Sequence, residues 1–170
     1  VRRQRQMCIR DRFFGWELVG LSSYLLISFW SEKKSAARAG NKAFILNRIG
    51  DFGFLIGLMM IISEFQTFNF LSIFESTLET KPENLDVIIL FLLLGAFGKS
   101  AQFPLFSWLP DAMEGPTPAS ALIHAATMVT AGVFMLVRIS PILQFSELGS
   151  LIIISMGLLT ALIAVSYTHL

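Results

Sequence analysis

The chain has 170 residues, of which 54% are hydrophobic and only 15% are charged, so it has too little polar surface to cover an ordinary water-soluble domain. Its single cysteine, Cys8, and its two distant histidines exclude a disulfide framework and a cysteine-based metal site. A net charge of +1 gives no basic footprint for nucleic acid. Composition therefore predicts a membrane protein.

The two ends differ from the rest of the sequence. Residues 1–12 hold five arginines and one aspartate and then run without a loop into an apolar stretch that begins at Phe13. Their apolar part is too short for a secretory signal, and a basic arm on the membrane surface is the alternative. Residues 165–170 also stop an apolar run abruptly. Both ends resemble translated sequencing-adapter sequence, so we predict that they are non-native and that the real protein extends in both directions.

Five apolar stretches approach the length of a membrane crossing. A helix needs about 20 apolar residues to cross a hydrocarbon core about 30 Å thick, and helices satisfy their own backbone in lipid. The sequence therefore predicts an all-α membrane fold with about five transmembrane helices. The predicted spans are residues 13–30, 43–62, 87–109, 119–137 and 148–164.

The connections between the spans predict the orientation. Residues 31–42 carry four lysines and arginines, whereas residues 63–86 carry one lysine among five acidic residues. Basic connections stay on the cytoplasmic or matrix side, so residues 31–42 are expected there. By alternation residues 110–118 return to that side, and residues 138–147 lie on the other.

The first span contains Glu17, fifteen residues before Glu32, which places it about 22 Å along a helix. It is deep in the membrane unless the span is strongly tilted. An unpaired charge at such depth costs at least about 2.5 kcal/mol. Glu17 therefore needs a partner or a function.

The second span contains Asp51, nine residues beyond Lys42. Arg48 lies three residues earlier, on the same helical face. An intrahelical pair between Arg48 and Asp51 near the cytoplasmic boundary could be purely structural. Gly53 and Gly57 form a GxxxG step in this span, which we interpret as a close helix-packing site.

The third span contains Lys99, about 18 Å along the helix and so near the bilayer midplane. Pro104 has no amide proton, so the Ser100 carbonyl loses its helical partner and the helix is expected to break just past the lysine. Free backbone dipoles beside a buried amine suit an ion site. We predict that Lys99 and Glu17 approach each other from different helices within about 4–6 Å. A lysine paired permanently with a carboxylate for assembly is the alternative.

The fourth span contains His124, with Ser120 and Thr127 on the same helical face. Imidazole can accept and donate protons near neutral pH, so the three side chains are expected to face the bundle interior on the Lys99 side and to line a hydratable path. The alternative is a histidine that only packs. In the preceding connection, Asp111 and Glu114 lie among three prolines and a glycine, and we expect them to be solvated or interface charges.

No nucleotide, flavin or iron–sulfur motif occurs in the sequence: GxGxxG, Walker, HExxH and cysteine-cluster patterns are all missing. The three tryptophans suit interfacial anchoring or helix packing; they are Trp16, Trp30 and Trp108.

Residues 98–132, GKSAQFPLFSWLPDAMEGPTPASALIHAATMVTAG, closely resemble the family of the largest antiporter-like subunit of respiratory complex I, NADH:quinone oxidoreductase. Residues 13–30 (FFGWELVGLSSYLLISFW) and 47–57 (NRIGDFGFLIG) resemble the preceding helices of the same family in the same order. The resemblance covers residues 13–164. Chloroplast NDH and the large subunit of multisubunit sodium/proton antiporters share much of the pattern, and the PDAMEGPTP form favours the respiratory enzyme.

The resemblance implies roles for particular residues. Glu17 and Lys99 occupy the positions of a pair within one ion-translocation half-channel, Pro104 lies where the family has a discontinuous helix, and His124 occupies the position of a proton relay. Asp51 is a further polar position of the family, with a possible role in translocation. The second inverted repeat and the long lateral helix of the family lie outside this sequence.

The resemblance also implies a function, namely proton translocation coupled to electron transfer from NADH to quinone elsewhere in the complex. This chain is expected to hold no cofactor or metal, while NADH, FMN, iron–sulfur clusters and quinone bind in other subunits. Its expected partners are the lipid bilayer, protons and other membrane subunits, including a neighbouring antiporter-like subunit, and not nucleic acid. A bacterial plasma membrane is the expected location, with the mitochondrial inner membrane or the thylakoid as alternatives. A sodium/proton antiporter subunit and a passive scaffold remain alternative functions.

Overall fold

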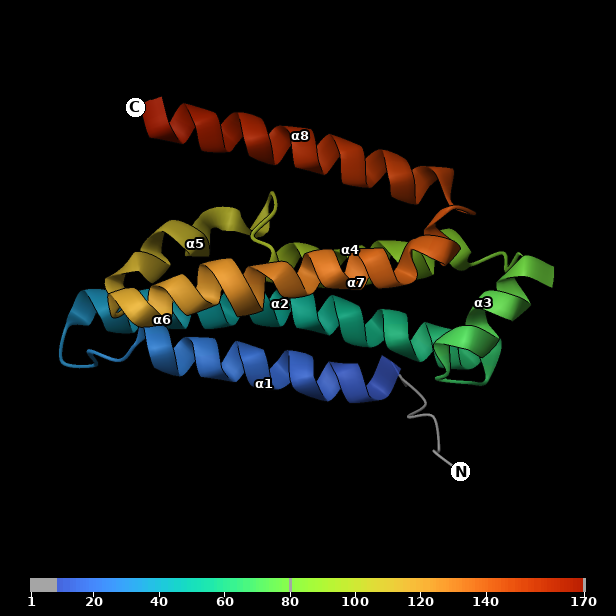
Figure 1. The fold of residues 1–170 in the computed structure, drawn as a ribbon, viewed down its shortest axis with the longest axis horizontal. Helices are drawn as coiled ribbons and strands as arrows, with labels where there is room; N and C mark the ends of the chain where they lie inside the picture. Colours follow the sequence, from blue (N-terminus) through green and yellow to red (C-terminus); the bar gives the residue numbers. More distant parts are fainter. Residues whose placement is uncertain (1–8, 80, 170) are drawn as a thin grey trace.

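The computed structural model describes residues 9–79 and 81–169 (Figure 1), and every regular element in these ranges is a helix. The predicted all-α membrane fold is confirmed. Five longer helices correspond to the predicted spans, and short helical pieces fill the break in the third span and the connection after it. The long helices are α1 (Ile9–Ile27), α2 (Lys34–Phe65), α4 (Leu85–Lys99), α7 (Met128–Leu143) and α8 (Glu147–His169).

The short pieces lie in two places. Helix α3 (Phe70–Glu79) occupies the connection between α2 and α4. The segment between α4 and α7 consists of a 3₁₀ turn, α5, a second 3₁₀ turn, α6 and a π-helical turn. Their bounds are Leu105–Ser107, Trp108–Asp111, Ala112–Glu114, Thr117–Ala121 and Leu122–Thr127.

Three helices of the described chain are long and apolar enough to cross a membrane, by length and composition: Lys34–Phe65, Thr117–Leu143 and Glu147–Tyr167. At 1.5 Å per residue, α2 is about 48 Å long, and it begins nine residues before the predicted span. By contrast α4 has 15 residues and is about 22 Å long, which is shorter than a bilayer core. The third crossing is therefore discontinuous, as predicted.

Helix α4 is the central element of the bundle. Helices α1, α2, α4 and α7 run side by side, whereas α8 lies along the outside (Figure 1), against α4 and α7. Ten of the 15 residues of α4 are buried. A helix that is apolar on all sides is typical of such a central position.

The glycines of α2 allow it to lie close to α4. A Cβ atom on Gly50 would be 3.1 Å from the Cα of Gly98, and one on Gly53 would be 2.6 Å from the side chain of Leu94. A Cβ atom on Gly57 would be 3.1–3.3 Å from side chains of α4. The interpretation of Gly53 and Gly57 as a packing site is confirmed.

Helix α3 was not predicted, because its residues were assigned to a connection between spans. Phe70, Ile73 and Thr77 are buried, and this spacing of three and four residues gives a short amphipathic helix. The helix contacts α7 at the end of the bundle.

The ends of the chain are only partly described. Residues 1–8 and Leu170, which belong to the segments predicted to be non-native, lie outside the described residues. Ile9 is buried, and its N–H donates to the Phe68 carbonyl at 3.1 Å, so α1 begins before Phe13. The non-native origin of both ends stays a prediction.

Candidate functional site

Lys99 is the last residue of α4, and its side chain is fully buried. The helix ends there because the following backbone turns away. Ala101 adopts a left-handed conformation with φ of 50°, and the Gln102 N–H donates to the Phe97 carbonyl at 3.0 Å. The predicted break just past the lysine is confirmed.

The carbonyls at the broken end are bonded by side chains. Trp108 is fully buried and donates its indole N–H to the Gly98 carbonyl at 3.1 Å. The Ser100 carbonyl, which Pro104 was expected to leave without a helical partner, accepts from the Gln102 side-chain amide at 3.3 Å. These bonds satisfy backbone acceptors that would otherwise be costly to bury.

The direct partner of Lys99 is Asp51 on α2. The Lys99 Nζ lies 3.0 Å from the Asp51 Oδ2, and 3% of the Asp51 side chain is exposed. The other carboxylate oxygen, Oδ1, accepts a 2.8 Å hydrogen bond from the Trp16 indole N–H on α1. Three helices thus meet at one buried carboxylate with a donor at each oxygen. An amine and a carboxylate buried together in this way can exchange a proton or hold one between them.

Gly20 provides the space for the lysine amine. A Cβ atom at this position would be 2.7 Å from the Lys99 Nζ and 3.7 Å from the Asp51 Oδ2. Gly20 is four residues after Trp16, so both lie on one face of α1. This face supplies a hydrogen-bond donor for Asp51 and an opening for the amine of Lys99.

The predicted pair between Glu17 and Lys99 is not the pair that the structure contains. Glu17 forms an ion pair with Arg48, and both side chains are partly exposed. On a helix Glu17 is turned by about 100° from Trp16, so the face of α1 that meets Asp51 and Lys99 carries the indole instead of the carboxylate. The alternative of an intrahelical pair between Arg48 and Asp51 is not what the structure contains, because each of the two residues pairs with a residue on another helix.

His124 lies within the π-helical turn and is half-buried. Its Nδ1 is 2.6 Å from the Ser120 carbonyl oxygen and 3.2 Å from the Ser120 hydroxyl; the contact with the carbonyl is a hydrogen bond when Nδ1 carries the proton. Its Nε2 is buried and has no hydrogen-bond partner among the described residues. Short π-helical turns occur often at functional sites.

His124 shares a pocket with Ser120 but not with Thr127, and its position on the Lys99 side stays a prediction. His124 and Ser120 line a pocket of about 340 Å³ whose walls come from the segment between Met113 and Ala125. Thr127 does not line it: the threonine is exposed, and its hydroxyl donates to the Leu122 carbonyl at 3.0 Å. The common face of an α-helix was assumed in the prediction, and the π-helical turn changes that register.

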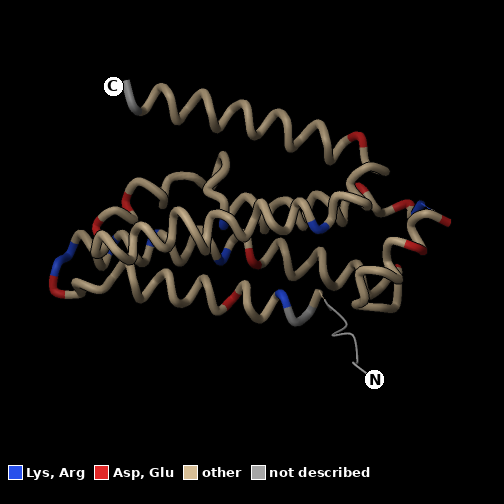
Figure 2. Tube along the Cα trace, viewed as in Figure 1, with Lys and Arg blue, Asp and Glu red and all other residues tan. Residues whose placement is uncertain are grey.

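Asp111 and Glu114 lie on the surface, as expected. Asp111 pairs with Lys42 at 2.7 Å with both side chains about half exposed, and Ser35 donates to Glu114 at 3.1 Å. Figure 2 shows that most charged residues gather at the two ends of the bundle and in the connections, and that only a few lie along the middle of the helices. The buried site is therefore separate from the charged ends.

Sequence reasoning missed Trp16, Gly20 and Trp108 as residues of the site. The tryptophans were interpreted as interfacial anchors or packing residues, and only the packing interpretation agrees with the burial of Trp16 and Trp108. The spacing of Trp16 and Gly20 by four residues was visible in the sequence. It gave no indication of which face of α1 meets α2.

Comparisons with known proteins agree on one family. The family model described as "NADH:quinone oxidoreductase/Mrp antiporter, TM" matches residues 9–169. NADH-ubiquinone oxidoreductase chain 5 of Acanthamoeba castellanii is 53% identical over 163 residues, covering 89% of this chain and 24% of that protein. NADH-quinone oxidoreductase subunit L of Neisseria meningitidis serogroup A is 51% identical over 162 residues, covering 88% of this chain and 24% of that protein.

A solved structure also matches. The structure of the Mrp complex from Dietzia sp. DQ12-45-1b contains a chain with a TM-score of 0.86 and 30% identity, covering 92% of this chain and 17% of that chain. This chain spans about a quarter of the length of the curated relatives that it matches. The family model covers nearly the whole chain. The chain therefore belongs to the NADH:quinone oxidoreductase/Mrp antiporter transmembrane family.

Proposed function

We propose that the intact protein is the large antiporter-like membrane subunit of respiratory NADH:quinone oxidoreductase and that it translocates protons across the membrane. The observation that carries the proposal is the fully buried Lys99 beside Asp51, at the point where α4 breaks. Ionisable residues at membrane depth are expensive and mark ion pathways by default. The relatives at about 50% identity are subunits of NADH oxidoreductases.

The chemistry of the proposed site is proton exchange. A nearby opposite charge favours the charged form of an ionisable group, whereas the loss of water disfavours that form. A change in the distance between the Lys99 Nζ and the Asp51 Oδ2 therefore changes whether the site holds a proton.

Glu17 and Arg48 form the neighbouring part of the proposed pathway. Arg48 and Asp51 lie one helical turn apart on α2, so the pair between Glu17 and Arg48 lies close to the buried pair along the membrane axis. Since both side chains are partly exposed, this pair can exchange protons with water more easily than Lys99 can. His124, with its free Nε2, is proposed as the next relay.

Electron transfer is proposed to take place in other subunits. NADH, FMN, iron–sulfur clusters and quinone would bind there, and this chain would contact other membrane subunits, including a neighbouring antiporter-like subunit. We place the protein in a bacterial plasma membrane, with the mitochondrial inner membrane and the thylakoid as alternatives.

A cation/proton antiporter is the second candidate function, because the chain from the Mrp complex has the same fold at a TM-score of 0.86. The curated relatives favour the respiratory enzyme, with 53% identity against 30% for that chain. A passive scaffold, in which the buried charges only hold helices together, is the third.

Lys99→Ala separates these functions. We expect closed membrane vesicles with the variant complex to lose NADH-driven proton uptake while the complex still assembles. Lys34→Ala, which removes an exposed lysine at the start of α2, is the control and should pump normally. Unchanged pumping by Lys99→Ala would support the scaffold. Sodium-dependent proton exchange without NADH, lost in the variant, would support the antiporter.

A further inference from the structure

The indole of Trp16 makes a buried hydrogen bond in addition to its packing contacts. It is buried, with 8% exposed, and its N–H points at the Asp51 Oδ1 at 2.8 Å. The Asp51 carboxylate accepts hydrogen bonds from this indole and from the Lys99 amine. Indole is a donor only and does not ionise in the physiological range. It can therefore hold the carboxylate without exchanging protons with it.

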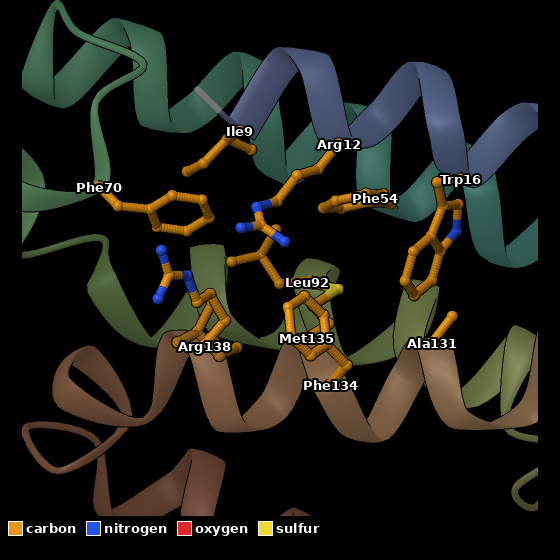
Figure 3. A pocket seen from close by; sticks show the side chains of 11 residues that line it. Ile9, Arg12, Trp16, Phe54, Phe70, Leu92, Ala131, Phe134, Met135 and Arg138 are labelled. Atoms are coloured by element: carbon orange, nitrogen blue, oxygen red, sulfur yellow. The ribbon is translucent and has the colours of Figure 1, made fainter. Parts of the chain in front are cut away.

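Two further contacts fix the indole. The centroid of the indole ring lies 5.2 Å from the centroid of the Phe54 ring. The Lys99 Nζ lies 5.9 Å from the centroid of the indole ring. A pocket of about 240 Å³ adjoins the indole, and Phe54, Leu92 and Met135 line it together with Trp16 (Figure 3). Arg12 and Arg138 also line this pocket, and its other walls are apolar. The Trp16 side chain thus lines this pocket and also binds the buried carboxylate of Asp51.

The orientation of the carboxylate depends on this bond. A carboxylate with one partner can rotate about its Cβ–Cγ bond, because terminal torsions of this type are soft. With the indole bonded to Oδ1, Oδ2 is turned toward the amine of Lys99, which rests in the space left by Gly20. Removing the indole donor leaves one buried oxygen without its partner and frees that rotation.

We propose that Trp16 is a positioning residue of the proton-translocating site, which acts through Asp51 by holding the carboxylate in the orientation that meets Lys99. This inference rests on the proposed function of the Lys99 site. It assigns to Trp16 the bond that sets the distance between the two charged groups. The aromatic contact with Phe54 keeps the indole in place.

Two substitutions separate the hydrogen bond from the ring. Trp16→Phe keeps an aromatic ring and removes the N–H, whereas Trp16→His has a smaller ring but restores a ring N–H. Both are made in the full-length subunit within its assembled complex, and the initial rate of NADH-driven proton uptake into closed vesicles is measured. Trp30→Phe, which removes an indole N–H from a half-exposed tryptophan, is the matched control.

Trp16→Phe should lower the uptake rate by roughly an order of magnitude, because one hydrogen bond to a charged group changes an equilibrium constant by about that factor. Trp16→His should recover a large part of that loss, and Trp30→Phe should pump at the wild-type rate. An uptake rate in Trp16→His that is no higher than in Trp16→Phe would overturn the inference, and so would a wild-type uptake rate in Trp16→Phe.

Lys99→Ala measured in the same vesicles distinguishes failure of the proposed function from failure of the role assigned to Trp16. If Lys99→Ala pumps normally, the proposed function fails. If Lys99→Ala loses pumping while both Trp16 variants behave alike, only the assignment of Trp16 fails. If a Trp16 variant assembles poorly, the uptake rate is divided by the NADH oxidation rate of the same vesicles, and the comparison of Phe with His is unchanged.

Discussion

At the scale of single residues, the site is defined by which side chains meet Asp51. The carboxylate receives the Lys99 amine at 3.0 Å and the Trp16 indole at 2.8 Å, so both of its oxygens are satisfied in a place where an unpaired charge would be costly. Glu17, on the next position of α1, pairs with Arg48 instead. One residue along a helix thus separates a buried contact from a partly exposed one.

Gly20 gives a prediction at this scale. Gly20→Ala would place a methyl group 2.7 Å from the Lys99 Nζ, the far end of a flexible side chain, so the amine has to move. We expect the variant to displace the amine from Asp51 and to lower proton uptake in vesicles.

Gly15→Ala is the matched control on the same helix, because its Cβ atom would meet nothing within 4 Å. It should pump and unfold as the wild type does. Equal behaviour of the two alanine variants would mean that the space at Gly20 is not needed by the lysine.

At the scale of elements, the broken end of α4 sets the position of Lys99. The helix was predicted to break just past Lys99, with irregular backbone near Pro104, and α4 ends at Lys99. Proline explains why the helix cannot continue through residue 104. The left-handed backbone at Ala101 was not predictable from composition, because a non-glycine residue adopts this conformation only when its surroundings hold it there.

Trp108 gives the prediction at the scale of elements. Trp108→Phe removes the donor of the Gly98 carbonyl, which leaves a buried acceptor unsatisfied at a cost of about 1–3 kcal/mol. We expect a lower melting temperature of the complex and a smaller amount of it in the membrane. The half-exposed Trp30, changed to Phe, serves as the reference. A melting temperature equal to that of the reference would show that water or another group satisfies this carbonyl.

The sequence was sufficient to predict the five longer helices and insufficient to predict α3 or the rotation of the helices. Apolar run length predicted the five longer helices, because hydrocarbon thickness fixes their length. The depth of a residue along a helix does not show which face of the helix turns toward a neighbour. For this reason Glu17 was predicted as the partner of Lys99, whereas the partner is Asp51. The rotation is set by contacts such as that of Gly50 with Gly98, and these depend on two helices at once.

At the scale of the whole molecule, charged residues occupy two different environments. Those at the ends of the bundle are exposed and include the pair between Lys42 and Asp111, and such pairs contribute little to stability. Lys99 and Asp51 lie in the interior, where α1, α2 and α4 meet. Desolvation makes the same chemistry far more sensitive to distance in the interior. We therefore propose that proton exchange centres on the interior pair, with Glu17, Arg48 and His124 as neighbouring parts of the pathway.

The most direct test of this assignment compares two carboxylates in one assay. Asp51→Asn and Asp111→Asn are made in the full-length subunit, and NADH-driven proton uptake is measured in closed vesicles with assembled complex. We predict that Asp51→Asn loses most of the uptake and that Asp111→Asn, at the exposed pair with Lys42, retains it. Normal uptake by Asp51→Asn, at a normal rate of NADH oxidation, would contradict the proposal that Asp51 and Lys99 form the proton-translocating site.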